Sequence, residues 1–295
     1  MADSPVVELN GGEAPWIALN LWPRLANTVD DIDRNIESAL QRTYIPLPEL
    51  VSSQSGAVSI VGSGPSLKKN WRRMVRMGQP IIACNAACQF LLERGIVPQY
   101  MFCFDADPLM LEFITPHPDI TYLMSSRCPP ETFELLKDCK VVVWHAGGDE
   151  NIEKLLQKHG KFQEPMVSGG TAAVTRSMLL AKAIGWNEIH LWGCDSSYSE
   201  GDTHIRKSTT EEKGLRVMVN KKEFLCSPWM CSQAEDFKVL APPLRDDYNV
   251  DLIVHGEGLI PHLAYSLYFK TDLEWEITRV CRMFLAVTRT LWSQI

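Results

Sequence analysis

The sequence predicts an α/β fold in which a parallel sheet is flanked by helices, because strand-like and helix-like segments alternate from about residue 56 onward. Short apolar, β-branched runs bounded by turn residues indicate the strands. An Ala- and Leu-rich stretch that ends at Gly185 is typical of a covering helix. We expect strands at 58–61, 80–84, 100–104, 121–124, 141–144, 188–192 and 252–255, and helices at 89–94, 130–137 and 171–184.

Three parts are expected along the chain: an N-terminal arm (1–55), the α/β domain (56–265) and a C-terminal helix (266–295). Within the arm, 30–41 has the spacing of an amphipathic helix, with apolar Ile32, Ile36 and Leu40 four residues apart. Residues 272–292 are also amphipathic, and we expect them to dock on the body or on a second subunit of a homo-oligomer.

A polar stretch at 199–223 carries Arg206, Lys207, Lys213, Arg216, Lys221 and Lys222. Because we find no apolar period in it, we predict a mobile loop or lid, with a solvated surface loop as the alternative.

Bulk properties exclude several classes of protein. A net charge of −7 over 295 residues argues against a protein that coats nucleic acid through charge alone, although a local basic groove remains compatible. No apolar run has the length of a membrane span, and the acidic, polar N-terminus does not read as a signal peptide. The nine cysteines are scattered without a CxxC pair, so we expect reduced core residues of a cytoplasmic protein and no structural zinc site.

The first candidate site follows the strand at 58–61, where Gly62, Ser63, Gly64, Pro65 and Ser66 lead into a basic, helix-compatible segment. A strand, a glycine turn and a helix bring backbone N–H groups and a positive helix end to one point, which suits a phosphate. The motif lacks the third glycine of the dinucleotide fingerprint and the Gly-Lys-Ser/Thr of a P-loop. An ordinary strand-to-helix turn is the alternative.

Polar residues follow two further predicted strands. Asn85 is placed to recognise a base edge or a ribose, or else to cap a helix. Asp105 and Asp107 come directly after 100–104, and two carboxylates so spaced suit Mg²⁺ or Mn²⁺ bridging a diphosphate. A solvated turn closed by Pro108 is the alternative.

Two more clusters complete the candidate set. Ser168, Gly169, Gly170 and Thr171 precede the Ala-rich helix and predict either a second anion cradle or a plain capping turn. In 193–204, Asp195 is placed to orient a ligand or bind metal, and His204 to act as a general base or to bind phosphate. We interpret His145, His159 and His255 as ordinary solvated histidines.

Together these motifs resemble two related groups of enzymes. Residues 60–67 are similar to the opening of bacterial sialyltransferases of the Gly-x-Gly-Pro-Ser-Leu type. They are also similar to the opening of the family that contains archaeal 6-hydroxymethylpterin diphosphokinases (MptE-like) and motility-accessory flagellin glycosyltransferases. Cys84-Asn85, Gly95–Tyr100 with Asp105, Ser168–Thr171 and Gly193–His204 resemble the later elements of the second family, in the expected order.

This resemblance implies a Rossmann-like domain that binds a nucleotide-activated donor. By similarity, Gly62, Gly64, Ser66, Asn85, Ser168 and Gly169 would surround the nucleotide, and Asp105, Asp195 and His204 would face the phosphates, a metal or the acceptor. The sialyltransferases carry a catalytic His in a Gly-His-Ser element, whereas 227–232 of this chain contains no His, which counts against their mechanism.

The leading hypothesis is a glycosyltransferase that moves a sugar from a nucleotide-activated donor to an acceptor hydroxyl, with Asp195 or His204 as base. The acceptor is a protein, a glycan, a lipid head group or a modified nucleobase. The first alternative is a diphosphokinase that uses ATP and Mg²⁺ on a pterin-like alcohol. The second is a nucleotide-binding scaffold without catalysis. The arm and C-terminal helix favour the glycosyltransferase, because they leave room for a larger acceptor.

Overall fold

A computed structural model describes residues 6–8, 27–148, 150–199, 214–219, 221–267 and 270–271. The predicted His204, most of the predicted lid and the predicted 272–292 helix lie outside these ranges.

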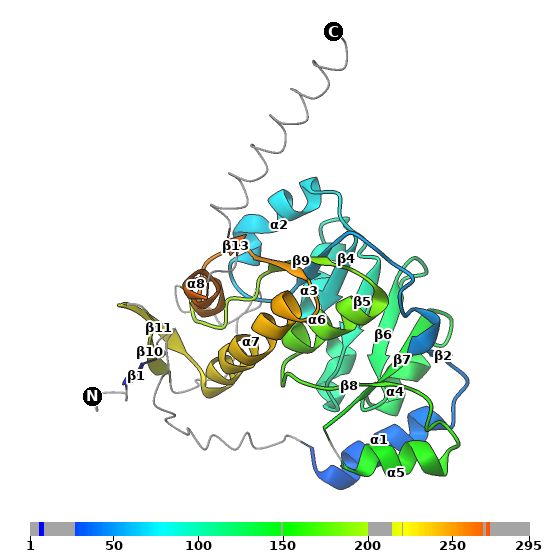
Figure 1. Ribbon diagram of the computed structural model, residues 1–295. Helices are drawn as coiled ribbons and strands as arrows, with labels where there is room; N and C mark the ends of the chain where they lie inside the picture. The colour runs from blue at the N-terminus through cyan, green and yellow to red at the C-terminus, as the bar shows by residue number, and fades with distance from the viewer. Residues whose placement is uncertain are drawn as a thin grey trace.

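Ten strands form one sheet, and every strand pairing in its described part is parallel, which confirms the predicted fold class (Figure 1). The spatial order is β13-β12-β9-β3-β4-β5-β6-β7-β2, with β8 paired to β7. The strands are β2 (Ile45–Pro46), β3 (Ala57–Val61), β4 (Ile81–Cys84), β5 (Tyr100–Cys103), β6 (Thr121–Ser125), β7 (Lys140–Ala146), β8 (Met166–Val167), β9 (Glu188–Trp192), β12 (Asp251–Val254) and β13 (Lys270–Thr271).

Helices lie on both sides of this sheet (Figure 1). They are α1 (Val29–Leu40), α2 (Leu67–Arg76), α3 (Ala86–Leu92), α4 (Pro130–Leu135), α5 (Glu150–Lys158), α6 (Ala173–Ile184), α7 (Pro228–Asp246) and α8 (Leu259–Ser266), with short 3₁₀ turns η1 (Leu47–Glu49) and η2 (Pro108–Glu112).

Strand residues alternate between two cores, one on each face of the sheet. In β5, Phe102 joins the core that contains side chains of α6, α7 and α8. Its neighbours Met101 and Cys103 join the core that contains side chains of α2 and α3. Because both faces are covered, the strands read as continuous apolar runs.

The α1 helix confirms the amphipathic helix expected near residues 30–41. Ile32, Ile36 and Leu40 are buried against Ile152 and Leu156 of α5, and the two helices lie side by side in Figure 1. Farther along, β2 pairs with β7. Residues 29–46, within the stretch expected to form an arm, are therefore packed on the α/β body.

The prediction of a mobile loop or lid at 199–223 is wrong for the last part of that stretch. Leu215–Val219 (β10) and Lys222–Cys226 (β11) form an antiparallel pair, and Val6–Glu8 (β1) pairs with β10 in parallel. Val217 and Val219 are fully buried, so this segment has the two-residue alternation of a strand. Interleaved basic residues concealed that period in the sequence.

No helix in the described ranges combines the length and the apolar character that crossing a bilayer requires.

Candidate functional site

The candidate site lies at the carboxyl ends of β3 and β9, two neighbouring strands from which the chain extends the sheet in opposite directions. Going from β3, the chain adds β4, β5, β6 and β7 on one side, whereas β9 and β12 lie on the other. Open parallel sheets bind ligands at such a switch point, outside the carboxyl ends of the strands. The turns after β3 and β9 therefore meet where a ligand is expected.

These two turns are packed tightly against each other. The N–H of Gly64 donates to the carbonyl oxygen of Gly193 over 2.8 Å, and the N–H of Gly62 donates to that of Trp192 over 2.8 Å. A Cβ on Gly62 or on Gly64 would lie 2.6 Å from the Gly193 oxygen. Glycine is thus required here for backbone-to-backbone packing, in addition to the predicted tight turn.

Asp195 follows β9 and occupies the start of α2. The residue is 3% exposed. One carboxylate oxygen accepts the N–H of Ser66 at 2.6 Å, and the other accepts the Ser66 hydroxyl at 2.5 Å. A carboxylate of the chain itself therefore holds a backbone N–H at the helix end where the sequence predicted a phosphate.

The buried position of Asp195 changes its acidity. Burial raises the pKa of this carboxyl to about 6, against the opposing effect of the two hydrogen bonds from Ser66. Glu257 raises the pKa further, whereas Lys69 lowers it. The pKa of Asp195 therefore lies nearer to neutral pH than that of an ordinary carboxyl.

Asn85 sits between β4 and α3 in a conformation that glycine normally adopts, with φ of 48° and ψ of −125°. Asn85 stands at the N-cap position of α3, as the alternative interpretation expected, but its side chain makes no capping hydrogen bond. The Asn85 Oδ1 atom is buried and has no hydrogen-bond partner among the described residues. A strained backbone with an unsatisfied amide oxygen points to recognition of a ligand.

Asp105 and Asp107 differ in their surroundings. Asp105 follows β5 and is an exposed residue. Desolvation of its carboxyl by the surrounding protein, and then the negative charge of Asp107, raise the pKa of Asp105, whereas the positive charge of Arg127 lowers it. Asp107 accepts the N–H of Leu109 at 2.8 Å and so caps η2. One oxygen of Asp107 is thus engaged in the turn that the sequence offered as the alternative to metal binding.

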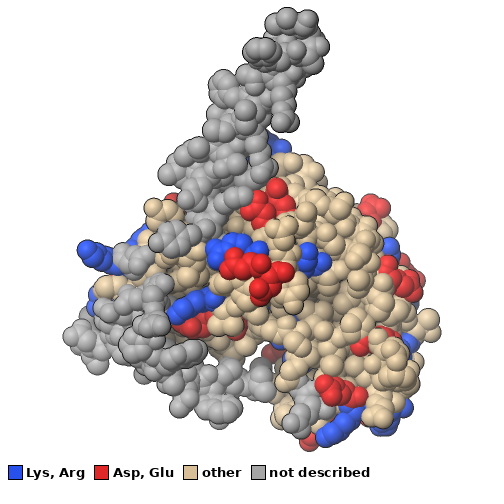
Figure 2. All heavy atoms as spheres, viewed as in Figure 1, with Lys and Arg blue, Asp and Glu red and all other residues tan. Residues whose placement is uncertain are grey.

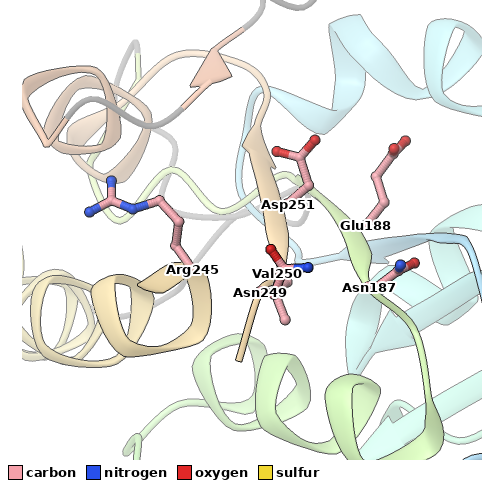
Figure 3. A pocket seen from close by; sticks show the side chains of 6 residues that line it. All are labelled: Asn187, Glu188, Arg245, Asn249, Val250 and Asp251. Atoms are coloured by element: carbon pink, nitrogen blue, oxygen red, sulfur yellow. The ribbon is translucent and has the colours of Figure 1, made fainter. Parts of the chain in front are cut away.

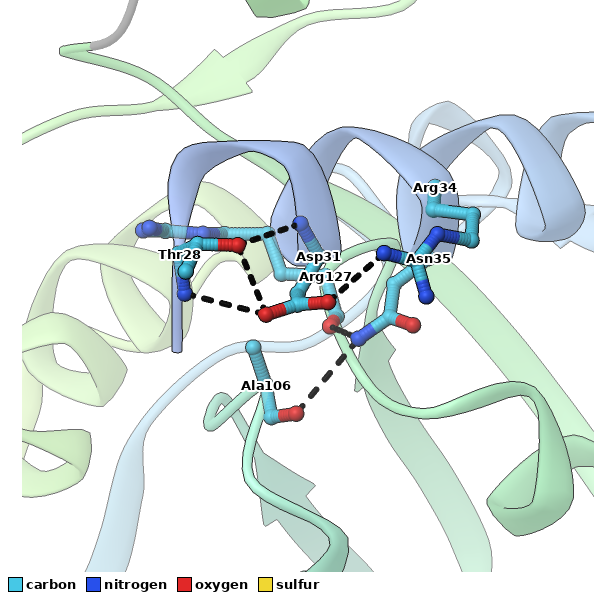
Figure 4. Close-up of polar contacts among 6 residues, drawn as sticks. All are labelled: Thr28, Asp31, Arg34, Asn35, Ala106 and Arg127. Carbon is cyan, nitrogen blue, oxygen red and sulfur yellow. Dashed lines mark hydrogen bonds and ion pairs between the residues drawn. The ribbon is translucent and has the colours of Figure 1, made fainter. Parts of the chain in front are cut away.

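Helix α1 ties this acidic loop to the next one. The side-chain amide of Asn35 donates to the carbonyl oxygens of Ala106, at 3.4 Å, and of Arg127, at 3.0 Å (Figure 4). It joins the loops that follow β5 and β6. Asn35 thereby fixes the spacing between Asp105 and Arg127.

The loop from Ser168 to Thr171 is held from two sides. Gly169 and Gly170 have φ of 92° and 78°. The carboxylate of Asp236 accepts the N–H of Thr171 at 2.5 Å and its hydroxyl at 2.6 Å. On the other side, Arg176 donates to the Gly170 carbonyl oxygen. As at Ser66, a carboxylate of the chain itself, here that of Asp236, accepts an N–H that was expected to bind phosphate.

One face of α7 forms a wall of the site that sequence reasoning missed. Besides Asp236, this face carries Gln233, whose side-chain oxygen accepts the Ser196 hydroxyl at 2.9 Å. It also carries Leu240, which packs on Gly169. Helix α7 therefore connects the loops that follow β8 and β9. On the other side of the Ser168–Thr171 loop, the basic residue Arg176 inside the mostly apolar α6 was a signal that the sequence did offer.

Two histidines interpreted as solvated are buried, because each lies in or directly after a strand that has neighbouring strands on both sides. His145 lies 3.0 Å from the Ser126 hydroxyl and 2.8 Å from Glu164. His255 lies 2.7 Å from His190 and stacks on Trp192. Ser126 is fully buried, so the Ser–His–Glu arrangement exposes no nucleophile to a substrate.

Within the described ranges, no three His, Cys, Asp or Glu side chains gather as a metal cluster. On the face shown in Figure 2, described Lys and Arg residues lie among Asp and Glu rather than in one broad basic patch. All the cysteines that the structure describes are free thiols, as expected.

A hollow of about 360 Å³ lies at the opposite edge of the sheet, around the amino ends of β9 and β12 (Figure 3). It is lined by Asn187, Glu188, Arg245, Asn249, Val250 and Asp251. This hollow is separate from the candidate site.

The parallel sheet and its switch-point glycine turn define a Rossmann-like α/β domain. The chain matches the family described as 6-hydroxymethylpterin diphosphokinase MptE-like over residues 31–201, more than half of its length, and it belongs to that family. No curated protein matches it.

Solved structures with a similar fold include a MAf glycosyltransferase from Magnetospirillum magneticum AMB-1, with a TM-score of 0.60 and 18% identity over 82% of this chain and 38% of that one. The chain thus spans well under half of that protein. A mammalian sialyltransferase (TM-score 0.42, 12% identity, 88% and 92% of the two chains) and the sialyltransferase CstII from Campylobacter jejuni (0.37, 14%, 70% and 86%) are more distant.

Proposed function

We propose that this protein is a transferase that moves a sugar from a nucleotide-activated donor to an acceptor hydroxyl. The observation that carries the proposal is Asn85: a strained residue at the carboxyl edge of the sheet, with a buried amide oxygen that lacks a partner. Membership of the MptE-like family and the fold shared with a MAf glycosyltransferase support a nucleotide-dependent transfer.

In this proposal each residue of the site has a distinct task. Asn85 would bind the base or ribose of the nucleotide through its side-chain amide. Asp195, with a pKa of about 6, would take the proton of the acceptor hydroxyl. The predicted base His204 lies outside the described residues and is an alternative for this step.

The oxygen donors Asp105 and Asp107 fit Mg²⁺ or Mn²⁺, which is commonly held by one or two carboxylates together with substrate phosphates. Such an ion would stabilise the charge of the leaving diphosphate. Asp105 would be the main protein ligand, because Asp107 already engages one oxygen in capping η2.

A diphosphokinase that acts on a pterin-like alcohol is the second candidate, and the description of the matching family favours it. A nucleotide-binding scaffold without catalysis is the third. Replacing Asp105 by Asn separates the classes: an enzyme would lose turnover, whereas a scaffold would lose only affinity.

Nucleotide binding is tested by a thermal-shift panel of CMP, UDP, GDP, ADP and ATP, each with and without Mg²⁺ or Mn²⁺. A ligand present at a hundredfold excess over its Kd stabilises a protein by about 2.7 kcal/mol. Stabilisation by a non-adenine nucleotide supports a sugar donor, and preference for ATP with Mg²⁺ supports the diphosphokinase. No shift with any nucleotide contradicts all three candidates.

Asn85→Gly is the informative variant for this panel. Glycine adopts the same backbone conformation without strain, so the variant should fold and keep its stability while it loses nucleotide affinity. Asn249→Gly is the matched control, since Asn249 also has a positive φ, of 51°, but lies at the opposite edge. Equal nucleotide affinity in the two variants would exclude Asn85 from the site.

A further inference from the structure

Arg176 is a buried cation held by neutral groups. It lies in the second turn of α6 and is 6% exposed. Its guanidinium donates to the carbonyl oxygens of Gly170 at 2.6 and 3.0 Å, Val167 at 2.7 Å and Gly147 at 3.3 Å. Among the described residues, no carboxylate forms an ion pair with it. Buried charges are ordinarily compensated by an opposite charge, so this arrangement favours binding of an anion.

A second guanidinium lies close by. The Arg127 Cζ atom is 5.5 Å from the centroid of the Phe104 ring, and the Arg176 Cζ atom is 4.7 Å from the same centroid. Burial and the charge of Arg127 lower the pKa of Arg176 to about 10, whereas Asp236 opposes them. Two like charges on one ring repel each other, and an anion bound by both would relieve that repulsion.

The two arginines come from different loops at one edge of the sheet. Arg127 follows β6, Phe104 follows β5, and Arg176 joins the loops after β7 and β8 through Gly147 and Gly170. Asn35 connects the Arg127 loop to the Asp105 loop. These are the carboxyl ends of parallel strands, where ligands of open α/β sheets bind.

The backbone donors expected to hold phosphate are engaged elsewhere. Asp195 accepts the N–H of Ser66, and Asp236 accepts the N–H of Thr171. We propose that Arg127 and Arg176 form an anion subsite that binds the phosphates of the substrate. The subsite takes a phosphate or diphosphate group; that this group belongs to a nucleotide rests on the proposed function.

The chemistry of the side chain suits this task. A guanidinium group presents a planar fork of N–H donors that matches phosphate oxygens, and Arg127 would supply this fork. Arg176 already donates its N–H groups to the carbonyl oxygens of Gly147, Val167 and Gly170, so it would act mainly through its positive charge. Asp105 next to Arg127 would repel a bare phosphate, and a divalent ion between Asp105 and the phosphate would remove that repulsion. We therefore expect Mg²⁺ to strengthen binding in this subsite.

Calorimetric titration with inorganic pyrophosphate tests the subsite without any nucleotide. It compares the unmodified full chain with Arg127→Gln, Arg176→Lys and Arg34→Gln, with and without Mg²⁺. Arg127→Gln should weaken pyrophosphate binding by about tenfold or more, the value expected for a charged hydrogen bond. Arg176→Lys keeps the positive charge, through which Arg176 would act, and should weaken binding less. Arg34 is exposed and pairs with Asp31, so Arg34→Gln should leave binding unchanged.

The outcomes separate this proposal from the function proposed above. Pyrophosphate binding that Arg127→Gln does not weaken, or weakening that Arg34→Gln reproduces, would overturn the subsite even when nucleotides bind. Binding that depends on Arg127 in a protein that binds no nucleotide would leave the subsite standing and remove the nucleotide transferase. If Arg176→Lys fails to fold, Arg127→Gln decides alone. Asn35 holds this loop through the carbonyl oxygen of residue 127, and the Arg127→Gln substitution leaves that hydrogen bond in place.

Discussion

Asp195 and Ser66 are 129 residues apart in the sequence and form short contacts in the site, at 2.5 and 2.6 Å. The sequence marked both residues, but for different partners: Ser66 for a phosphate and Asp195 for the acceptor or a metal. The structure joins them to each other. A buried carboxylate with a raised pKa is costly for stability, and such residues are concentrated at functional sites.

Replacing Asp195 by Asn should remove a pH-dependent part of the free energy of unfolding. The folded-state pKa of about 6 lies above the reference value of 3.8, so the contribution of Asp195 to stability is fully present below pH 3.8 and is lost as pH rises through 6. The full difference is about 3 kcal/mol, and about 1.4 kcal/mol of it falls between pH 5 and pH 8. Asn does not titrate and avoids this loss.

Urea unfolding of both proteins at pH 5 and pH 8 measures the effect. The stability of Asp195→Asn relative to the unmodified protein should increase from pH 5 to pH 8, while transferase activity falls. A pH-independent difference between the two proteins would show that Asp195 does not titrate in this range.

At the level of single elements, α1 shows how a helix outside the predicted domain shapes the site. Its sequence period predicted a buried apolar stripe, and Ile32, Ile36 and Leu40 are buried as expected. The period contained no information about Asn35, whose two carbonyl partners lie 71 and 92 residues away. Polar contacts over such distances depend on how loops are placed in space.

Asn35→Ala should destabilise the protein by about 1 kcal/mol and also weaken pyrophosphate or nucleotide binding, because the Asp105 and Arg127 loops lose their connection. Thr28→Ala is the control on the same helix. Thr28 accepts the N–H of Asp31 as the N-cap, so its loss costs about 1 kcal/mol without touching these loops.

Chemical unfolding and ligand titration of the two variants give a direct comparison. Equal losses of affinity in Asn35→Ala and Thr28→Ala would mean that α1 acts only through general stability.

Across the whole molecule, the contact between the turns after β3 and β9 holds together the two sides of the sheet. Gly62→Ala should cost about 3 kcal/mol, since the new Cβ would lie 2.6 Å from the Gly193 oxygen and 2.9 Å from Val174. Gly56→Ala is the control: it meets no atom within 4 Å, and only its φ of 79° makes it unfavourable.

Thermal unfolding should therefore rank Gly62→Ala well below Gly56→Ala. If the two variants unfold alike, the turns separate more easily than their packing indicates.

Periodicity and composition were sufficient to predict the parallel sheet, the covering helices after β4, β6 and β8, and the α1 stripe. Local patterns reflect burial directly, because each strand or helix must hide its apolar side. Strands β2 and β8 have two residues each and carry no readable period. Helix α7 was missed as well; it contains Pro242 and Pro243, which usually indicate the end of a helix.

Family membership and the positions of Gly62, Asn85, Asp105 and Asp195 at strand ends followed from the order of residues along the chain. The hydrogen-bond and contact partners of these residues did not follow from that order. Asp195 on Ser66, Asp236 on Thr171 and the two arginines on Phe104 are long-range contacts, created when strands distant in sequence end at one edge of the sheet. A linear pattern records the side chains available to a site, whereas their partners depend on how the sheet brings its loops together.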